Sequence, residues 1–137
     1  MRISKRHARK QALIEGFRSN FELSIAKWLE SKGIPYQYEK LKLKYIVPET
    51  QRTYTPDWQI TSTPDIIYES KGRFTAVDRK KMLLVRKSNP QITIRMIFQN
   101  ASVRLSKQSK TTYAEWCDKN NIEWCEFKSG LPKSWVK

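Results

Sequence analysis

The sequence predicts a mixed α/β domain built around one sheet. Segments with a hydrophobic residue at every second position alternate with segments of helical spacing, in the order helix, three strands, helix, strand, helix, strand. The chain has 137 residues, of which 39% are hydrophobic and five are tryptophan. This length suits one domain with one core, and the aromatic content argues against disorder.

The first predicted helix spans about residues 19–32. Its apolar side chains fall on one face: Phe21, Ile25, Trp28 and Leu29. Ser19 and Glu22 have the spacing of a capping box at its start, and Gly33 and Pro35 end it. Before it, residues 1–16 form a basic arm, either a disordered solubilising tail or a segment that contacts phosphates. The remainder, residues 17–137, is expected to form a single domain.

Alternating residues then predict one long half-buried strand over residues 36–47, with lysines on its exposed face and Pro48 at its end. Residues 50–52 are expected to form a loop. Residues 54–60 and 66–71 are predicted to be two strands joined by a turn that contains Pro64 and Asp65.

The second half continues with a helix from Thr75 to about residue 87, followed by a strand over residues 92–98. A polar, basic loop occupies residues 99–110. A short helix begins at Thr112, with Glu115 in the capping-box position, and a last strand is predicted over residues 122–127.

The charge balance predicts a polyanionic partner. Lysine and arginine number 27 and the acidic residues 13, so the net charge is +14. The like charges of such a domain repel one another unless an anion such as nucleic acid offsets them. No apolar run has the length of a membrane span, and no signal peptide is indicated. Two cysteines and one histidine exclude a disulfide framework and a zinc site made of Cys and His alone. We expect a cytoplasmic protein without a membrane anchor or a small-molecule cofactor.

Asp57, Glu69 and Lys71 are the first candidates for chemistry. Glu69 and Lys71 are two positions apart on a predicted strand and share one face of the sheet. Pairing through the intervening turn would bring Asp57, on the preceding strand, beside Glu69. Carboxylates bind Mg²⁺, which neutralises a phosphodiester and lowers the pKa of bound water. Two ions roughly 4 Å apart would clamp the attacking and leaving oxygens, while the lysine orients the water.

Each of these residues also has a simpler interpretation. Glu69 and Lys71 could form a surface ion pair worth less than about 1 kcal/mol. Asp65 is a rival to Asp57, but aspartate is common in turns. The capping-box position of Glu22 is a complete structural explanation for that residue.

Candidate DNA-binding residues are basic side chains in the arm, just before the first helix, in the second helix and in the basic loop. The arm contributes Arg2, Lys5, Arg6, Arg9 and Lys10, and the other segments contribute Arg18, Arg79, Lys80, Lys81, Arg104 and Lys107. Contacts of this kind fix the position of a protein on phosphates without reading the base sequence.

The chain resembles the phage endonuclease I family, which resolves Holliday junctions. The matching stretches, spread over residues 17–135, are Phe17-Arg18-Ser19 with Glu22, Tyr54-Thr55-Pro56-Asp57, Glu69-Ser70-Lys71-Gly72, Asp78-Arg79-Lys80-Lys81, Tyr113-Ala114-Glu115-Trp116-Cys117 and Pro132-Lys133-Ser134-Trp135.

The resemblance implies a restriction-endonuclease-like mixed sheet flanked by helices. It also implies Mg²⁺-dependent cleavage, with two ions in each site and Mn²⁺ as a substitute. The implied catalytic residues are Glu22, Asp57, Glu69 and Lys71, the three acids being metal ligands. A strand-bridged, domain-swapped homodimer is implied, with residues 41–49 as the bridge. In each composite site, Glu22 would come from one chain and the other three residues from its partner.

Three functions stay open on the sequence. The first is a structure-selective endonuclease that cuts four-way and other branched DNA junctions. The second is a sequence-specific endonuclease of a mobile element or of repair on the same core. The third is a basic nucleic-acid-binding protein without catalysis.

Overall fold

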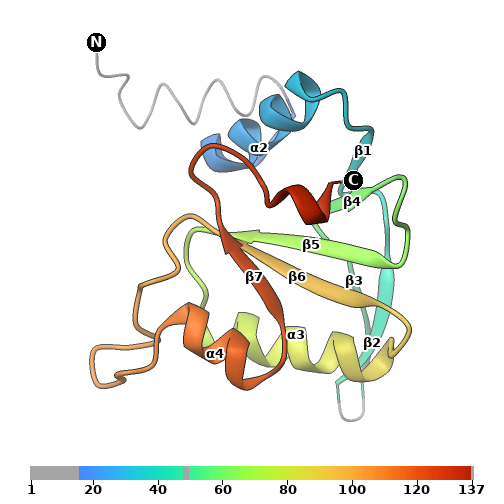
Figure 1. Cartoon of the computed structure of the whole chain (residues 1–137). Helices are drawn as coiled ribbons and strands as arrows, with labels where there is room; N and C mark the ends of the chain where they lie inside the picture. Colours follow the sequence, from blue (N-terminus) through green and yellow to red (C-terminus); the bar gives the residue numbers. More distant parts are fainter. Residues whose placement is uncertain (1–15, 48–49, 137) are drawn as a thin grey trace. The chain divides into compact units, whose positions relative to one another are not determined.

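The computed structural model describes residues 16–47 and 50–136 and consists of two compact units, which comprise residues 1–35 and 36–137 (Figure 1). The described part of the first unit is dominated by one helix, α2 (Asn20–Ser31), as predicted. Ser19 is its N-cap, and its hydroxyl accepts a hydrogen bond from the Glu22 N–H at 3.1 Å. The Glu22 carboxylate accepts from the N–H of Arg18, at 3.2 Å, rather than completing the reciprocal bond of a capping box.

The second unit contains a five-stranded mixed sheet. Its strands lie in the order β1 (Tyr36–Tyr38), β4 (Trp58–Ile60), β5 (Ile66–Lys71), β6 (Thr93–Phe98) and β7 (Glu123–Glu126). β4 pairs antiparallel with both β1 and β5, whereas β5, β6 and β7 run parallel to one another. Each parallel step is a crossover through a helix, α3 (Ala76–Ser88) or α4 (Tyr113–Lys119). The predicted mixed α/β class is thus confirmed.

Two predicted strands, and the loop predicted between them, differ from the structure. The predicted strand 36–47 is two strands, because β1 ends at Tyr38 and β2 (Leu43–Val47) belongs to a separate two-stranded ribbon. Its partner is β3 (Thr50–Tyr54), which includes the predicted loop 50–52. The first strand ends before Glu39, whose φ of 52° lies in the left-handed region. A strand cannot continue through such a residue.

The predicted strand 54–60 is also interrupted. Tyr54 ends β3 and Trp58 begins β4, so Thr55, Pro56 and Asp57 connect the ribbon to the sheet. Proline in this connection is reasonable because it has no N–H to donate to a ladder.

The core lies between the sheet and the two helices α3 and α4, which cover the same face (Figure 1). Both capping boxes predicted for these helices are present, at Thr75 with Asp78 and at Thr112 with Glu115. Alternate residues of β5 and β6 contact the helices: Ile67, Ile94, Met96 and Phe98. Glu69 and Lys71 continue the row of Ile67 along β5 and therefore share this helix-covered face.

The cysteines lie in this unit as buried, free thiols, as expected of small core residues. Burial raises the pKa of both Cys117 and Cys125 to about 12, so neither forms a thiolate at neutral pH. Among the described residues, every helix is too short or too polar to cross a membrane.

Candidate active site

The candidate site lies at the end of β5, beside the first turn of α3. In the antiparallel pair of β4 and β5, Trp58 is opposite Tyr68, which brings the next residues, Asp57 and Glu69, together at the end of the ladder. The N–H of Asp57 donates to Glu69 Oε2 at 3.4 Å. Asp57 thus directly precedes β4 instead of lying on it, but the predicted approach of the two acids occurs.

Glu69 is a buried acid, with 5% of its surface exposed. Its Oε2 atom accepts a hydrogen bond from the hydroxyl of Tyr54, and its Oε1 atom lies 3.5 Å from Lys71 Nζ. Burial, together with the charge of Asp57, raises the pKa of Glu69 to about 8, although Lys71 and Tyr54 act in the opposite direction. This burial excludes the interpretation of Glu69 and Lys71 as an exposed surface pair.

Asp57 is held by Ser70, the residue between Glu69 and Lys71. One carboxylate oxygen, Oδ2, accepts from the Ser70 N–H at 3.0 Å and from the Ser70 hydroxyl at 2.9 Å. The same hydroxyl accepts from the indole Nε1 of Trp58 at 3.0 Å. Burial raises the pKa of Asp57, while the bonds from Ser70 and the charge of Lys71 reduce that rise. Asp57 is therefore a partly desolvated carboxylate that holds a proton more readily than an exposed aspartate does.

Lys71 lies between two acids. Its Nζ is 3.5 Å from Glu69 Oε1 and 3.5 Å from Asp78 Oδ1. Burial disfavours the ammonium, but the charges of Glu69, Asp78 and Asp57 outweigh it and raise the pKa of Lys71. The other oxygen of Asp78 accepts from the N–H and hydroxyl of Thr75 at the start of α3. The start of this helix and the lysine are therefore joined by one carboxylate.

Glu39 is a member of this region that the sequence prediction missed. Its N–H donates to the carbonyl oxygen of Asp57 at 3.2 Å, and the two side chains each place a carboxylate oxygen within 4.8 Å of the other's. The negative charge of Glu39 contributes to the raised pKa of Asp57. A signal was present: the hydrophobic positions change from even numbers at Tyr36 and Tyr38 to odd numbers at Leu43 and Tyr45. Such a change of phase marks a break in a strand.

The other candidates are distributed as follows. Glu22 belongs to the first compact unit, and its role in the site stays a prediction. Arg18, in the same unit, is exposed. The arm residues Arg2, Lys5, Arg6, Arg9 and Lys10 lie outside the described residues. Asp65, the rival acid, lies in the turn before β5, at the opposite end of that strand from Lys71.

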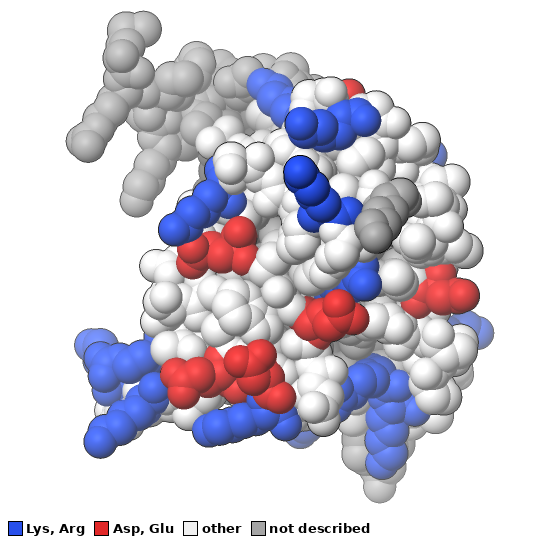
Figure 2. Space-filling view, viewed as in Figure 1, with Lys and Arg blue, Asp and Glu red and all other residues white. Residues whose placement is uncertain are grey.

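The basic residues of α3 differ in their surroundings. Arg79 donates to the carbonyl oxygen of Phe74 at 2.7 Å, and the ammonium of Lys81 lies 5.4 Å from the centre of the Tyr54 ring. Lys80 is exposed, as are Arg104 and Lys107 in the loop between β6 and α4. Figure 2 shows lysine and arginine side chains gathered where Figure 1 draws that loop.

The donor set suits a hard divalent cation. Asp57, Glu69 and Glu39 offer carboxylate oxygens, and the described part of this region has no histidine or cysteine ligand that would favour a softer metal. Two oxygens, Asp57 Oδ2 and Glu69 Oε2, already accept protein hydrogen bonds. The remaining oxygens of these acids are the ones suited to ligation.

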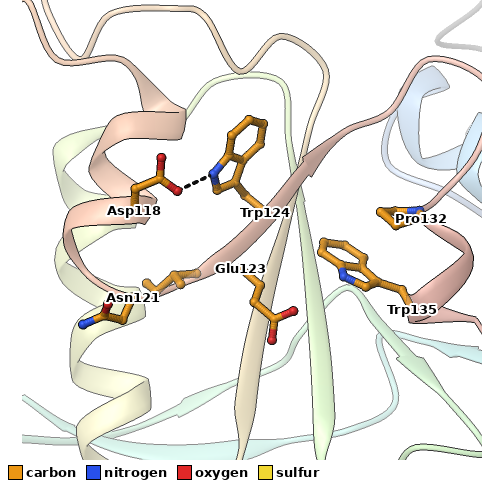
Figure 3. Close-up of a pocket in the computed structure, with 7 residues that line it drawn as sticks. Asp118, Asn121, Glu123, Trp124, Pro132 and Trp135 are labelled. Carbon is orange, nitrogen blue, oxygen red and sulfur yellow. Dashed lines mark hydrogen bonds between the residues drawn. The ribbon is translucent and has the colours of Figure 1, made fainter.

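The second unit also contains a separate pocket. It is lined by residues of α4, β7 and the C-terminal segment, and the Trp124 indole donates to Asp118 at 2.8 Å across its rim (Figure 3). Glu123 in this pocket is paired with Arg95 at 3.3 Å. Its acids are thus engaged with neighbours, and none of the predicted catalytic residues lines it.

Comparison of the sequence with known proteins shows its family. Residues 3–137 match the family model described as phage endonuclease I. The chain is 39% identical over 124 residues to Endonuclease I of Escherichia phage T7, covering 90% of this chain and 80% of that protein. It is 42% identical over 106 residues to Endodeoxyribonuclease 1 of Enterobacteria phage T3, covering 77% and 68%. The chain therefore belongs to the phage endonuclease I family.

Proposed function

We propose that this protein is a structure-selective DNA endonuclease that resolves four-way (Holliday) and other branched junctions by metal-dependent phosphodiester hydrolysis. The observation that carries the proposal is the meeting of Asp57, Glu69 and Lys71 at one end of β5, in a chain of the phage endonuclease I family. A buried acid and a half-buried acid beside a lysine are costly for a fold to maintain, and perturbed groups of this kind cluster at functional sites.

Each residue has a distinct task in this proposal. Asp57 and Glu69 hold Mg²⁺, for which Mn²⁺ can substitute, at two ions per site, and Glu22 and Glu39 complete the set of carboxylates. A metal held by these acids would offset the charge of the phosphodiester and lower the pKa of bound water, so that hydroxide would be available to attack. Lys71 keeps its positive charge because its pKa is raised, and it orients the nucleophile and stabilises the charge that develops on the phosphate.

The proposal includes a homodimer with two composite sites. The ribbon of β2 and β3 includes most of the predicted bridge, residues 41–49, and is not part of the five-stranded sheet. In each site, Glu22 of one protomer would join the other residues from its partner. Two sites allow paired cuts on two strands of a junction.

DNA affinity in this proposal comes from contacts with phosphates. Lys80, Arg104 and Lys107 are exposed on the second unit and offer contacts that depend on shape and salt rather than on base sequence. Such binding suits a substrate defined by its branching and found in the cytoplasm of a host cell.

The test is a cleavage assay on a synthetic four-way junction and on linear duplexes of the same sequences, with Mg²⁺ or with EDTA. The wild-type protein should cut the junction in preference, and only with the metal. Lys71→Ala and Asp57→Ala should lose cleavage by at least a hundredfold and still bind the junction. Preferential cutting of one linear site would favour a sequence-specific endonuclease. Binding without any cutting would leave only a non-catalytic nucleic-acid-binding protein.

A further inference from the structure

We propose that Tyr54 is a positioning residue for the Glu69 carboxylate, and that its hydroxyl keeps one carboxylate oxygen directed toward the metal position. This inference rests on the proposed function. The Tyr54 hydroxyl donates to Glu69 Oε2, which leaves Oε1 on the side of Lys71. The two oxygens of Glu69 therefore have different tasks: Oε2 anchors the side chain and Oε1 is available as a ligand.

The contact is built into the fold. Tyr54 is 3% exposed and belongs to the hydrophobic core cluster, where its strand partner is Leu43. The ammonium of Lys81 lies 5.4 Å from the centre of its ring, within the range of a cation–π contact. A ring held in this way presents its hydroxyl at a fixed point, so the hydrogen bond does not depend on a mobile side chain.

The other contacts of the Glu69 carboxylate are longer, and one of them is the ion pair of Oε1 with Lys71 Nζ at 3.5 Å. The other donor to Oε2 is the N–H of Asp57, at the long distance of 3.4 Å. Without the phenol, the carboxylate could turn about its last bond and exchange the positions of its two oxygens. Partners outside the ligand shell commonly set ligand orientation in metal sites, and their loss typically costs 10- to 100-fold in metal affinity or activity.

Tyr54 also joins the ribbon to the catalytic strand. It is the last residue of β3, in the two-stranded ribbon, whereas Glu69 lies in β5 of the five-stranded sheet. The hydrogen bond between them therefore fixes the position of the ribbon end relative to the candidate metal ligand. A displacement of this end of the ribbon would move the carboxylate with it.

The test compares Tyr54→Phe with Tyr68→Phe. Tyr68 is a suitable control because it is 1% exposed and immediately precedes Glu69 on β5, but its hydroxyl contacts the Trp135 carbonyl oxygen at 3.3 Å and Arg95 Nη1 at 3.1 Å. Mn²⁺ affinity is measured from the electron paramagnetic resonance signal of free Mn²⁺, and the Mg²⁺ concentration for half-maximal junction cleavage is measured in parallel. Thermal unfolding followed by circular dichroism shows that each variant is folded.

We expect Tyr54→Phe to weaken Mn²⁺ binding and to raise the half-saturating Mg²⁺ concentration by about 10- to 100-fold, with junction binding in EDTA unchanged. Tyr68→Phe should stay within about twofold of wild type. Incorporation of 4-aminophenylalanine at position 54 keeps the ring and a donor group and should restore at least part of the affinity. This variant also tests the inference if Tyr54→Phe does not fold.

Wild-type Mn²⁺ affinity in folded Tyr54→Phe would overturn the inference, as would an equal loss in Tyr68→Phe. Neither result would affect the proposed function, since metal-dependent cleavage by the wild-type protein would remain. Conversely, if the wild-type protein bound no Mn²⁺ and cut no junction, the proposed function itself would fail.

Discussion

Replacing Glu69 by glutamine should make the metal-free protein more stable at alkaline pH while removing its activity. The pKa of this buried carboxyl is about 8 in the folded protein against an ordinary value of 4.5. A group whose pKa is raised by folding contributes stability that is fully present below pH 4.5 and is lost as the pH rises through 8. At higher pH the wild-type protein must carry a buried charge that glutamine does not have.

The size of the effect follows from the shift. Between pH 5 and pH 9 the proton-linked loss for one group with these two pKa values is about 4 kcal/mol. For a domain of this size that corresponds to roughly 10–15 °C in melting temperature. The difference in melting temperature between Glu69→Gln and wild type should therefore grow by this amount from pH 5 to pH 9. Thermal unfolding in EDTA, followed by circular dichroism at several pH values, measures it.

Magnesium provides the internal control for this prediction. A bound cation stabilises the ionised carboxylate, so Mg²⁺ should raise the melting temperature of the wild-type protein most at pH 9 and change Glu69→Gln little. Parallel stability curves for the two proteins across this pH range would show that Glu69 titrates at an ordinary pKa. The account of its burial would then be refuted.

Three further predictions concern neighbouring residues. Ser70→Ala leaves the indole N–H of Trp58 without its acceptor, so urea unfolding should show a loss of about 1–3 kcal/mol together with slower cleavage. Glycine adopts the left-handed conformation of Glu39 without strain, so Glu39→Gly should change the free energy of unfolding by no more than about 1 kcal/mol. It should still reduce cleavage, and unreduced cleavage would exclude Glu39 from the site. Removing the side chains of Arg104 and Lys107 together should lower the slope of log affinity against log salt by about 2, and an unchanged slope would show that this loop does not contact DNA.

Much of the fold follows from local patterns. The helices were predictable because a capping residue and an apolar stripe coincide, as at Thr75 and Thr112. The parallel strands β5 and β6 are hydrophobic runs on either side of a helix, an arrangement typical of a crossover. Spacing on the predicted strands identified Asp57, Glu69 and Lys71, the family resemblance added Glu22, and the hairpin of β4 and β5 explains why Asp57 and Glu69 meet.

The ribbon was harder to predict, for a physical reason. The residues of β2 alternate with period two, as those of β1 do, whereas β3 is polar except at Tyr54, and period two does not reveal which strand pairs with which. The change of phase after Tyr38 was the available signal, and it also indicated Glu39. The roles of Tyr54, Ser70 and Asp78 could not be read from spacing, because each depends on contacts between segments distant in the sequence.

The arrangement of these contacts explains how a small domain can maintain a cluster of acids. Glu69 is buried and Asp57 is half-buried, and each has one oxygen bound by a protein donor, the Tyr54 hydroxyl or the Ser70 hydroxyl. These bonds offset part of the cost of burial but leave the pKa of both acids above its ordinary value. In the proposed function, a divalent cation would remove the remaining cost by replacing the proton, because it would stabilise both charges at once. Metal affinity and the instability of the metal-free site would then have the same origin, and a variant that removes the buried charge should lose the metal.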